Sequence, residues 1–461
     1  MAAITKIDSS ELISAQRALF RQPLALQWLE DGRLMKRSEG ERQAGKFELF
    51  LDLLYVAILA NFADNLAEDV SGVNLVKYIA SSIFVIKLIL TPTWHVWSDL
   101  RELMNSFYTD DLAQRVLILW VMALLVIYGN NATLVNEDIS AMRATVGAYM
   151  VARMSTTTTH LLYSFASYHH RAQQRLWFCL SILGLSIYIP LFVESISLRS
   201  KIAVASVGII VEECIWVFCY APASKKLLRA RYTTAVDIPH EVDRFAAFFI
   251  IVLGEFLYSI VVGSPAAIGF NDRLLRAIWT LIIAFCLNWL YLHNDGAVNG
   301  VHPLRHSIYA AFSWVVLHLP LVASLLAGGH VAAISARSSE LEVGELWLLC
   351  GGIGAGLILL YVIALLHKSE DGRGALLLPK PARLIIRPVS GIIIICLPLA
   401  HDLGITSTVS IIMALCVLSV IWENITSLMR GAKFWEKWVN TKYPESNEIS
   451  TQPQLSGSPG G

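Results

Sequence analysis

Apolar segments of about twenty residues recur along the whole chain and constrain its fold more than any other feature. A helix needs about twenty apolar residues to cross the hydrocarbon of a bilayer, where its backbone polar groups must be satisfied internally. We therefore predict an all-α fold, a polytopic transmembrane helix bundle of about 12 spans (10–12). The twelve candidate segments are 47–66, 73–92, 112–129, 143–163, 176–192, 200–220, 245–263, 275–293, 307–328, 345–367, 383–400 and 404–422.

The composition agrees with a membrane protein and excludes several kinds of partner. Of the residues, 55% are apolar and only 16% are charged, whereas about a quarter of the residues in soluble domains are charged. The formal net charge is zero, so we expect the lipid bilayer as a partner and no nucleic acid. All seven cysteines lie inside predicted spans without a CxxC pair, which indicates neither disulfides nor a metal site. The oligomeric state stays open.

The distribution of basic residues divides the chain into three parts and gives it an orientation. We predict a cytosolic N-terminal arm at 1–46, a transmembrane helical domain at 47–422, and a cytosolic tail at 423–461, disordered from about 446. Lys and Arg concentrate in the arm, the tail and the loops on the same side of a twelve-span arrangement. Both termini are therefore predicted to be cytoplasmic, and in a eukaryote we expect the endomembrane system (ER). A glycosylation sequon at Asn131 falls in an outer loop.

Two acidic residues inside apolar segments are the strongest functional signal. Asp52 and Glu255 are each followed three positions later by a tyrosine, Tyr55 and Tyr258. A carboxyl group at membrane depth is costly unless it is paired, protonated or facing a cavity. Six spans separate the two acids, so both helices would cross in the same direction. This pattern predicts a possible 6+6 parallel repeat with the acids near a central interface.

Each acid also has a structural interpretation. Asp52 could form an ion pair inside the bundle, with Arg153 or Arg387 as its partner. Glu255 follows Gly254, and glycine allows helices to approach closely, so Glu255 could form a hydrogen bond that locks two helices. The functional interpretation is a protonated carboxyl group with a raised pKa that acts as a general acid.

Three motifs around these residues resemble a known family. They are Glu48-Leu-Phe-x-Asp52-Leu, then His240-x-x-Asp243-Arg244-Phe245 leading to Gly254-Glu255, and finally His318-Leu-Pro320. In their order and spacing, the motifs resemble those of the bacterial low temperature requirement A proteins and their fungal relatives, from about 45 to 425. The resemblance implies a polytopic helical fold and little about chemistry. Phe256 stands where the family usually has a small polar residue, so the surroundings of Glu255 are bulkier and more apolar here.

Other polar and aromatic residues could line a pocket near the two acids. Glu212 and Glu213 are adjacent and face about 100° apart, so we expect only one of them to point inward. Pro320 frees a backbone carbonyl near His318, although a lone histidine in a span is often a packing residue. Tyrosine and tryptophan are also common interfacial anchors. The predicted pocket residues are Tyr55, Tyr258, Trp289, His318, Glu212 and Asn288.

The first functional hypothesis is a membrane enzyme that acts on a hydrophobic small-molecule substrate. A protonated carboxyl group can open an epoxide or alkene, and aromatic rings can stabilise the resulting cation. Glu255 and Asp52 would be the acid or base. This is the chemistry of fungal membrane-bound meroterpenoid terpene cyclases, which are similar in size and layout. The apolar surroundings of Glu255 favour this metal-independent cyclase, for which we expect no cofactor.

The alternative is a proton-coupled transporter or ion channel of the same family. Paired acids inside the membrane, at the interface of two repeats, are what proton coupling requires. Against this alternative, the sequence has no ring of charges and no pair of Gly-Pro-broken helices to mark a clear route. The sequence thus leaves enzyme and transporter open.

Overall fold

Each of the twelve predicted spans coincides with a helix in the computed structural model. The structure describes residues 19–30, 33–37, 42, 45–69, 75–261, 269–293, 296–297, 300–372, 374–400 and 402–431, with side chains from 88 onward in the second helix. Within these residues, ten helices are long and apolar enough to cross a membrane. The prediction of an all-α polytopic bundle is confirmed. The predicted disordered tail lies outside the described residues.

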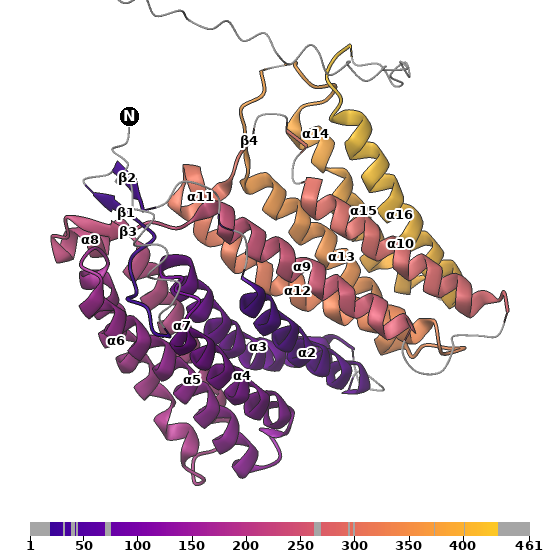
Figure 1. The fold of residues 1–461 in the computed structure, drawn as a ribbon. Coiled ribbons are helices and arrows are strands. Elements are labelled where there is room, and N and C mark those ends of the chain that lie inside the picture. Colours follow the sequence, from indigo (N-terminus) through magenta and orange to yellow (C-terminus); the bar gives the residue numbers. More distant parts are fainter. Residues whose placement is uncertain are drawn as a thin grey trace, which may run out of the picture.

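The first half of the bundle, drawn in indigo to magenta in Figure 1, is a group of six long helices. α2 packs against α3 and α4, and α4, α5, α6 and α7 then pack in chain order. α3 also contacts α5 and α7, and so lies inside the group. The elements are α2 (Lys46–Asp69), α3 (Leu75–Ser106), α4 (Leu112–Asn131), η1 (Ala132–Leu134), α5 (Ile139–Ala166), α6 (Arg171–Leu185), η2 (Ser186–Phe192) and α7 (Leu198–Tyr220).

The second half, drawn in pink to yellow, repeats this order of packing. α9 packs against α10 and α12, and α12, α13, α15 and α16 then pack in chain order, while α10 contacts α13 and α16. The two halves therefore correspond helix by helix, as a six-plus-six repeat requires. The elements are α9 (Ile238–Val261), α10 (Asp272–His293), α12 (Ile308–Ser335), α13 (Val343–Leu366), α14 (Lys380–Leu384), α15 (Ile386–Cys396), η3 (Leu397–Leu399) and α16 (Ile405–Thr426).

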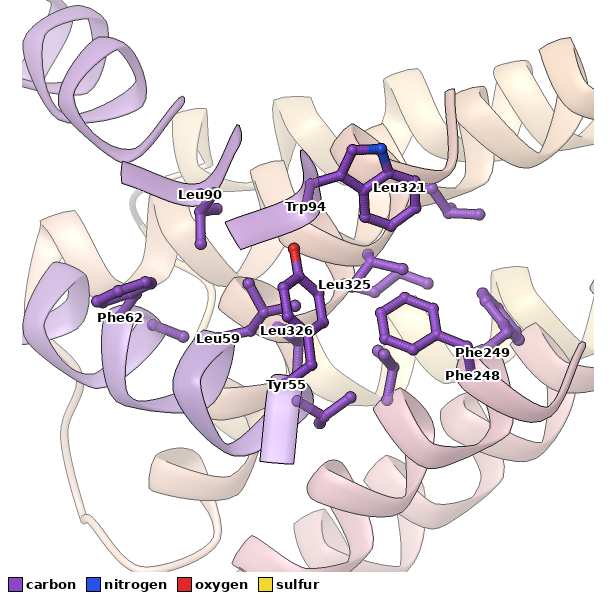
Figure 2. Packing of buried hydrophobic residues seen from close by; sticks show 14 of the residues in the cluster. Tyr55, Leu59, Phe62, Leu90, Trp94, Phe248, Phe249, Leu321, Leu325 and Leu326 are labelled. Carbon is purple, nitrogen blue, oxygen red and sulfur yellow. The ribbon is translucent and has the colours of Figure 1, made fainter. Parts of the chain in front are cut away.

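The two halves meet where α2 lies against α9 and α12. Figure 2 shows this junction as a dry layer of aromatic and aliphatic side chains. Because lipid tails are as apolar as these side chains, close packing stabilises the layer more than exclusion from water does. The labelled members are Tyr55, Leu59, Phe62, Leu90, Trp94, Phe248, Phe249, Leu321, Leu325 and Leu326.

Short strands and helices lie together at one end of the bundle, where both described chain ends also lie (Figure 1). Strands β1 and β2 come from the N-terminal segment, and β3 comes from the chain between α7 and α9. The three form an antiparallel sheet in the order β2-β1-β3, so the N-terminal segment docks on this part of the chain. These elements are β1 (Gln27–Glu30), β2 (Arg33–Lys36), α8 (Pro222–Leu228), β3 (Tyr232–Thr234), β4 (Gly300–Val301), α11 (Pro303–His306) and β5 (Lys368–Ser369).

The second span extends well beyond its predicted end. We expected it to stop at residue 92, but α3 continues through Pro92 to Ser106. Proline removes one helical hydrogen bond and usually kinks or ends a helix. Here the hydroxyl of Tyr128 donates a hydrogen bond to the carbonyl of Ile89 at 2.7 Å, in the same turn. The extension carries several charged residues into the bundle.

Candidate functional site

Asp52 is fully buried and its carboxylate is completely engaged. Nη1 and Nη2 of Arg244 on α9 donate to its two oxygens at 2.8 and 2.7 Å, and Nε1 of Trp97 on α3 donates at 2.7 Å. Asp52 thus forms the structural ion pair that was one of its two interpretations. The partner is Arg244 from the other half of the bundle, and not Arg153 or Arg387.

The other charged members of the first two motifs lie one turn nearer the end of the bundle that carries the strands. Glu48 is buried beside the ring of His240, with 3.1 Å between Oε2 and Nε2, and accepts a hydrogen bond from the backbone of Gly45 at 2.5 Å. Arg42 contacts both Glu48 and His240, whereas Asp243 is exposed. These motifs therefore join α2, α9 and the N-terminal segment.

Glu255 lies far from Asp52 along the bundle. Asp52 is the seventh residue of α2, and Glu255 is the eighteenth residue of α9. Eleven residues separate Glu255 from Arg244, which is about 16 Å along a helix. Glu255 is half-buried and accepts a hydrogen bond from Ser259 at 3.4 Å. The two acids are not equivalent positions of the repeat, and the acid-x-x-Tyr match that predicted the repeat is a coincidence.

The surroundings of Glu255 differ from the helix seam that Gly254 indicated. Gly254 is exposed, and a Cβ at this position would meet nothing within 4 Å. Tyr258 is 60% exposed and Trp289 is 41% exposed, so both rings face outward from the bundle. Within the described residues, Glu255 and these two aromatic residues do not form an enclosed pocket.

The remaining predicted pocket residues lie in separate places. Tyr55 is buried in the dry layer, with its ring 5.6 Å from that of Phe248. His318 is buried on α12, where its Nε2 lies 3.0 Å from the hydroxyl of Tyr291. Asn288 is half-buried on α10. Pro320 is exposed inside α12, and Asn131 ends α4 with its amide donating to the carbonyl of Ile127 at 2.8 Å.

Glu212 is the one predicted pocket residue that lies in a group of buried charges, which we call the charged cluster. Its members are His95 and Asp99 from α3, Arg153 from α5, and Glu212 and Glu213 from α7. Membrane helices rarely carry ionisable residues, and those present usually pair inside the bundle and mark functional sites.

Arg153 joins two of the carboxylates. Its Nη1 donates to Oδ1 of Asp99 at 2.5 Å and its Nη2 to Oε1 of Glu212 at 3.3 Å. The hydroxyl of Thr156, one turn along α5, donates to the other oxygen of Asp99 at 2.9 Å. Two more hydroxyls, of Tyr149 and Tyr188, donate to Oε2 of Glu212 at 2.5 and 2.7 Å.

His95 lies between the two adjacent glutamates. Its Nε2 is 2.9 Å from Oε1 of Glu213, and its Nδ1 is 3.4 Å from Oε2 of Glu212. The expectation that only one glutamate points inward is wrong, because an imidazole ring placed between the two side chains reaches both. Glu213 is the most accessible member, with 34% of its side chain exposed.

A small cavity of about 20 Å³ adjoins the charged cluster. All five members of the cluster line it, together with the rings of Trp94, Trp177 and Trp216. At least 10–15 Å³ is needed to hold one water molecule, so the cavity is large enough for one. Neither Asp52 nor Glu255 lines it.

A further series of buried polar contacts lies on the same extension of α3. Arg101 pairs with Glu241 of α9, and Nδ2 of Asn105 donates to the same carboxylate at 3.2 Å. Glu102 accepts a hydrogen bond from Nε1 of Trp216 at 2.5 Å. The sequence contains a signal for this series and for the cluster, because His95, Asp99 and Glu102 follow Pro92 at spacings of four and three residues, which place them on one helix face. We missed it by ending the span at the proline.

In the second half, Arg387 and Glu423 form an ion pair in which both side chains are fully buried. The charged cluster differs, because its member Glu213 is partly exposed. Arg387 of α15 donates to both oxygens of Glu423 of α16 at 2.6 Å. The guanidinium also donates to the carbonyls of Leu360 and Leu290, at 3.0 and 3.1 Å. This pair is buried and bidentate, and a pair of this kind locks helices together.

No group of three His, Cys, Asp or Glu residues among those that the structure describes could hold a metal ion. The charged cluster offers three carboxylates, one imidazole and one guanidinium. These groups can bind a proton, exchange it among themselves, or neutralise a small charged solute.

The fold and these buried charges define the class of this chain, a polytopic helical protein of the membrane. The family described as Bacterial low temperature requirement A protein (LtrA) matches residues 43–423, and the chain belongs to this family. Searches of curated proteins and of solved structures gave no match. The family match spans α2 to α16 and confirms the resemblance to the low temperature requirement A family.

Proposed function

We propose that this protein conducts protons across the membrane, as a proton transporter or channel, and that the charged cluster binds the proton. The observation that carries the proposal is the convergence of five ionisable side chains from three helices beside a cavity. The cluster has three carboxylates, of Asp99, Glu212 and Glu213, and one guanidinium, of Arg153. With a neutral His95 its net charge is negative, which favours the uptake of a proton or another cation.

The geometry around His95 supports proton exchange. The ring nitrogens lie 2.9 and 3.4 Å from carboxylates that have different surroundings. Glu212 is held by Arg153 and two tyrosine hydroxyls, whereas Glu213 is partly exposed and contacts only His95 among the described residues. A proton that reaches Glu213 can therefore pass to His95 without breaking the contacts of Glu212.

The arrangement of the helices agrees with transport. The two halves pack in the same order, and many transporters place their sites within or between such repeats. They meet in a dry layer at α2, α9 and α12 (Figure 2). A contact between two similar halves can open or close by a small rotation of one half against the other.

The cyclase hypothesis receives less support from the same geometry. An acid-initiated cyclisation needs a protonated carboxyl group that faces an enclosed apolar cavity. Asp52 is paired with Arg244 through both oxygens, and Glu255 is half-exposed beside outward-facing rings. Turnover of a prenyl epoxide by membranes with the wild-type protein, and its loss in Glu255→Gln, would revive the cyclase.

The transporter is tested by proton flux into vesicles that contain the purified protein. A potassium gradient with valinomycin imposes a membrane potential, and a trapped dye reports the internal pH. We expect faster acidification than in protein-free vesicles, and a return to the protein-free rate in Glu213→Gln. This glutamate is partly exposed, so the variant should fold.

The matched control is Glu194→Gln, since 76% of the Glu194 side chain is exposed away from the cluster. It should transport protons like the wild type. Wild-type vesicles that acidify no faster than protein-free vesicles, or a Glu213→Gln variant with the wild-type rate, would contradict the proposal.

A further inference from the structure

A second and larger cavity, of about 110 Å³, lies among α3, α4, α5, η2 and α7. Its lining includes Asn136, between η1 and α5, and Leu198, the first residue of α7. Its lining is mostly aliphatic and aromatic, and Leu198, at its edge, is 42% exposed. Since one water needs about 10–15 Å³ on the same measure, this apolar cavity has room for a group several times larger than one water.

Two buried polar side chains without a described partner line this apolar cavity. Lys201 is only 6% exposed, and its ammonium forms no salt bridge or hydrogen bond with any residue that the structure describes. The hydroxyl of Thr145 is buried and also lacks a hydrogen-bond partner among the described residues. The ammonium nitrogen of Lys201 keeps some accessible surface and Lys201 lines the cavity, so an anionic group that enters the cavity can pair with it.

We propose that the apolar cavity binds an anionic single-chain amphiphile, whose headgroup pairs with Lys201. A carboxylate or phosphate would neutralise the ammonium and accept a hydrogen bond from Thr145. The first part of the chain would fill the space between Leu191 and Ile202, and the rest would leave past Leu198, whose side chain is 42% exposed. This headgroup chemistry is common to free fatty acids and to membrane phospholipids.

The inner wall of the apolar cavity is shared with the charged cluster. Tyr149 and Tyr188 line the cavity, and their hydroxyls hold Oε2 of Glu212. Gly208 allows the ring of Tyr188 to pack directly against α7, because a Cβ at this position would lie 2.6 Å from Cζ of Tyr188. A bound amphiphile would therefore touch both phenol rings that position Glu212.

The test is competitive binding to the full-length protein in nanodiscs of zwitterionic lipid. A fluorescent fatty acid, parinaric acid, is displaced by dodecanoate, dodecyl phosphate or dodecanol. We expect at least one of the two anions to compete about tenfold more strongly than the alcohol, as a charge-assisted contact implies. The better anion identifies the source, a fatty acid for dodecanoate or a phospholipid for the phosphate.

Two variants separate the headgroup from the chain. Lys201→Met should abolish the preference for anions, whereas Lys226→Met, which changes an exposed lysine on α8, should retain it. Ala205→Phe, which fills the apolar cavity, should weaken all three competitors at least tenfold. Equal competition by dodecanol and both anions, or an unchanged preference in Lys201→Met, would overturn the proposal. Proton flux is not used as a readout, so this outcome does not depend on the proposed function.

Discussion

At the scale of single residues, one of the two acids that the sequence singled out is structural. Asp52 is buried, and it accepts hydrogen bonds from Arg244 and Trp97. The guanidinium comes from α9 and the carboxylate from α2, so this ion pair ties the two halves together. A bidentate pair of this kind is specific in geometry as well as favourable in energy.

This role predicts a large loss of stability when one partner is removed. Arg244→Gln leaves a buried carboxylate without a counter-charge, which costs about 3–5 kcal/mol in buried pairs. The double variant Asp52→Leu with Arg244→Met removes both charges and should be less destabilised than the single variant. Thermal unfolding in detergent, followed by tryptophan fluorescence, measures both. A double variant that is less stable than Arg244→Gln would contradict the role.

His170 predicts a pH dependence at the docking site of the N-terminal segment. It lies just before α6, where its Nε2 donates to the carbonyl of Gln27 in β1 at 3.0 Å. Burial lowers the pKa of His170 to about 4, from about 6.5 in an exposed histidine. The folded protein therefore holds the neutral ring, and it loses stability as the pH falls from about 6.5 toward 4, by up to about 3 kcal/mol.

The variant His170→Gln provides the check, because it keeps a donor but does not titrate. The melting temperature of the wild type should fall more between pH 6.5 and pH 5 than that of the variant. Parallel curves for the two proteins over this range would show that His170 does not titrate on unfolding.

At the scale of elements, glycines set the close packing of the second half. A Cβ at Gly352 of α13 would lie 2.5 Å from the carbonyl oxygen of Ser324 and 2.6 Å from the amide nitrogen of Gly328, both on α12. A Cβ at Gly354 would lie 2.6 Å from the carbonyl oxygen of Gly391 on α15. Small residues at such seams let membrane helices approach closely.

Adjacent glycines on α13 offer a matched pair of variants. Gly352→Ala should destabilise the protein by about 1–3 kcal/mol, because backbone atoms of α12 would have to move. Gly351→Ala should be neutral or slightly stabilising, since a Cβ there meets nothing within 4 Å and alanine favours helix. Melting temperatures of the two variants in the same detergent decide this. Equal losses of stability in the two variants would contradict the close packing of α13 against α12 at Gly352.

The element scale also shows where the sequence was informative. Each of the twelve apolar segments coincides with a helix, and ten of the described helices are long and apolar enough to cross a membrane. The end of α3 was missed, because Pro92 normally terminates a helix and here does not. This error placed His95 and Asp99 outside the membrane helices, and so the charged cluster was not predicted.

At the scale of the whole molecule, two groups of six helices pack in the same order. The repeat was predicted from Asp52 and Glu255, but those acids occupy different depths in α2 and α9. The acid-x-x-Tyr pattern specifies only two residue types, and so it does not determine how far along its helix a side chain lies. The correspondence of the halves lies in the order of helix packing, which a single sequence does not display.

An even number of spans predicts that both termini lie on one side of the membrane. The described chain ends lie at the same end of the bundle (Figure 1), and the basic residues there predict the cytoplasmic side. Tags at the two termini should be cleaved together when protease is added to the cytoplasmic face, and protected together in sealed vesicles of the opposite orientation. Protection of one tag alone would contradict twelve spans.

The central claim is that the charged cluster binds and releases protons during transport. The most direct measurement is the transient current that a pH step produces in vesicles adsorbed on a solid-supported membrane. The wild type and Glu194→Gln should give a charge movement, and Glu213→Gln should give none above protein-free vesicles. A wild type without a current, or a Glu213→Gln variant with the wild-type current, would contradict the account.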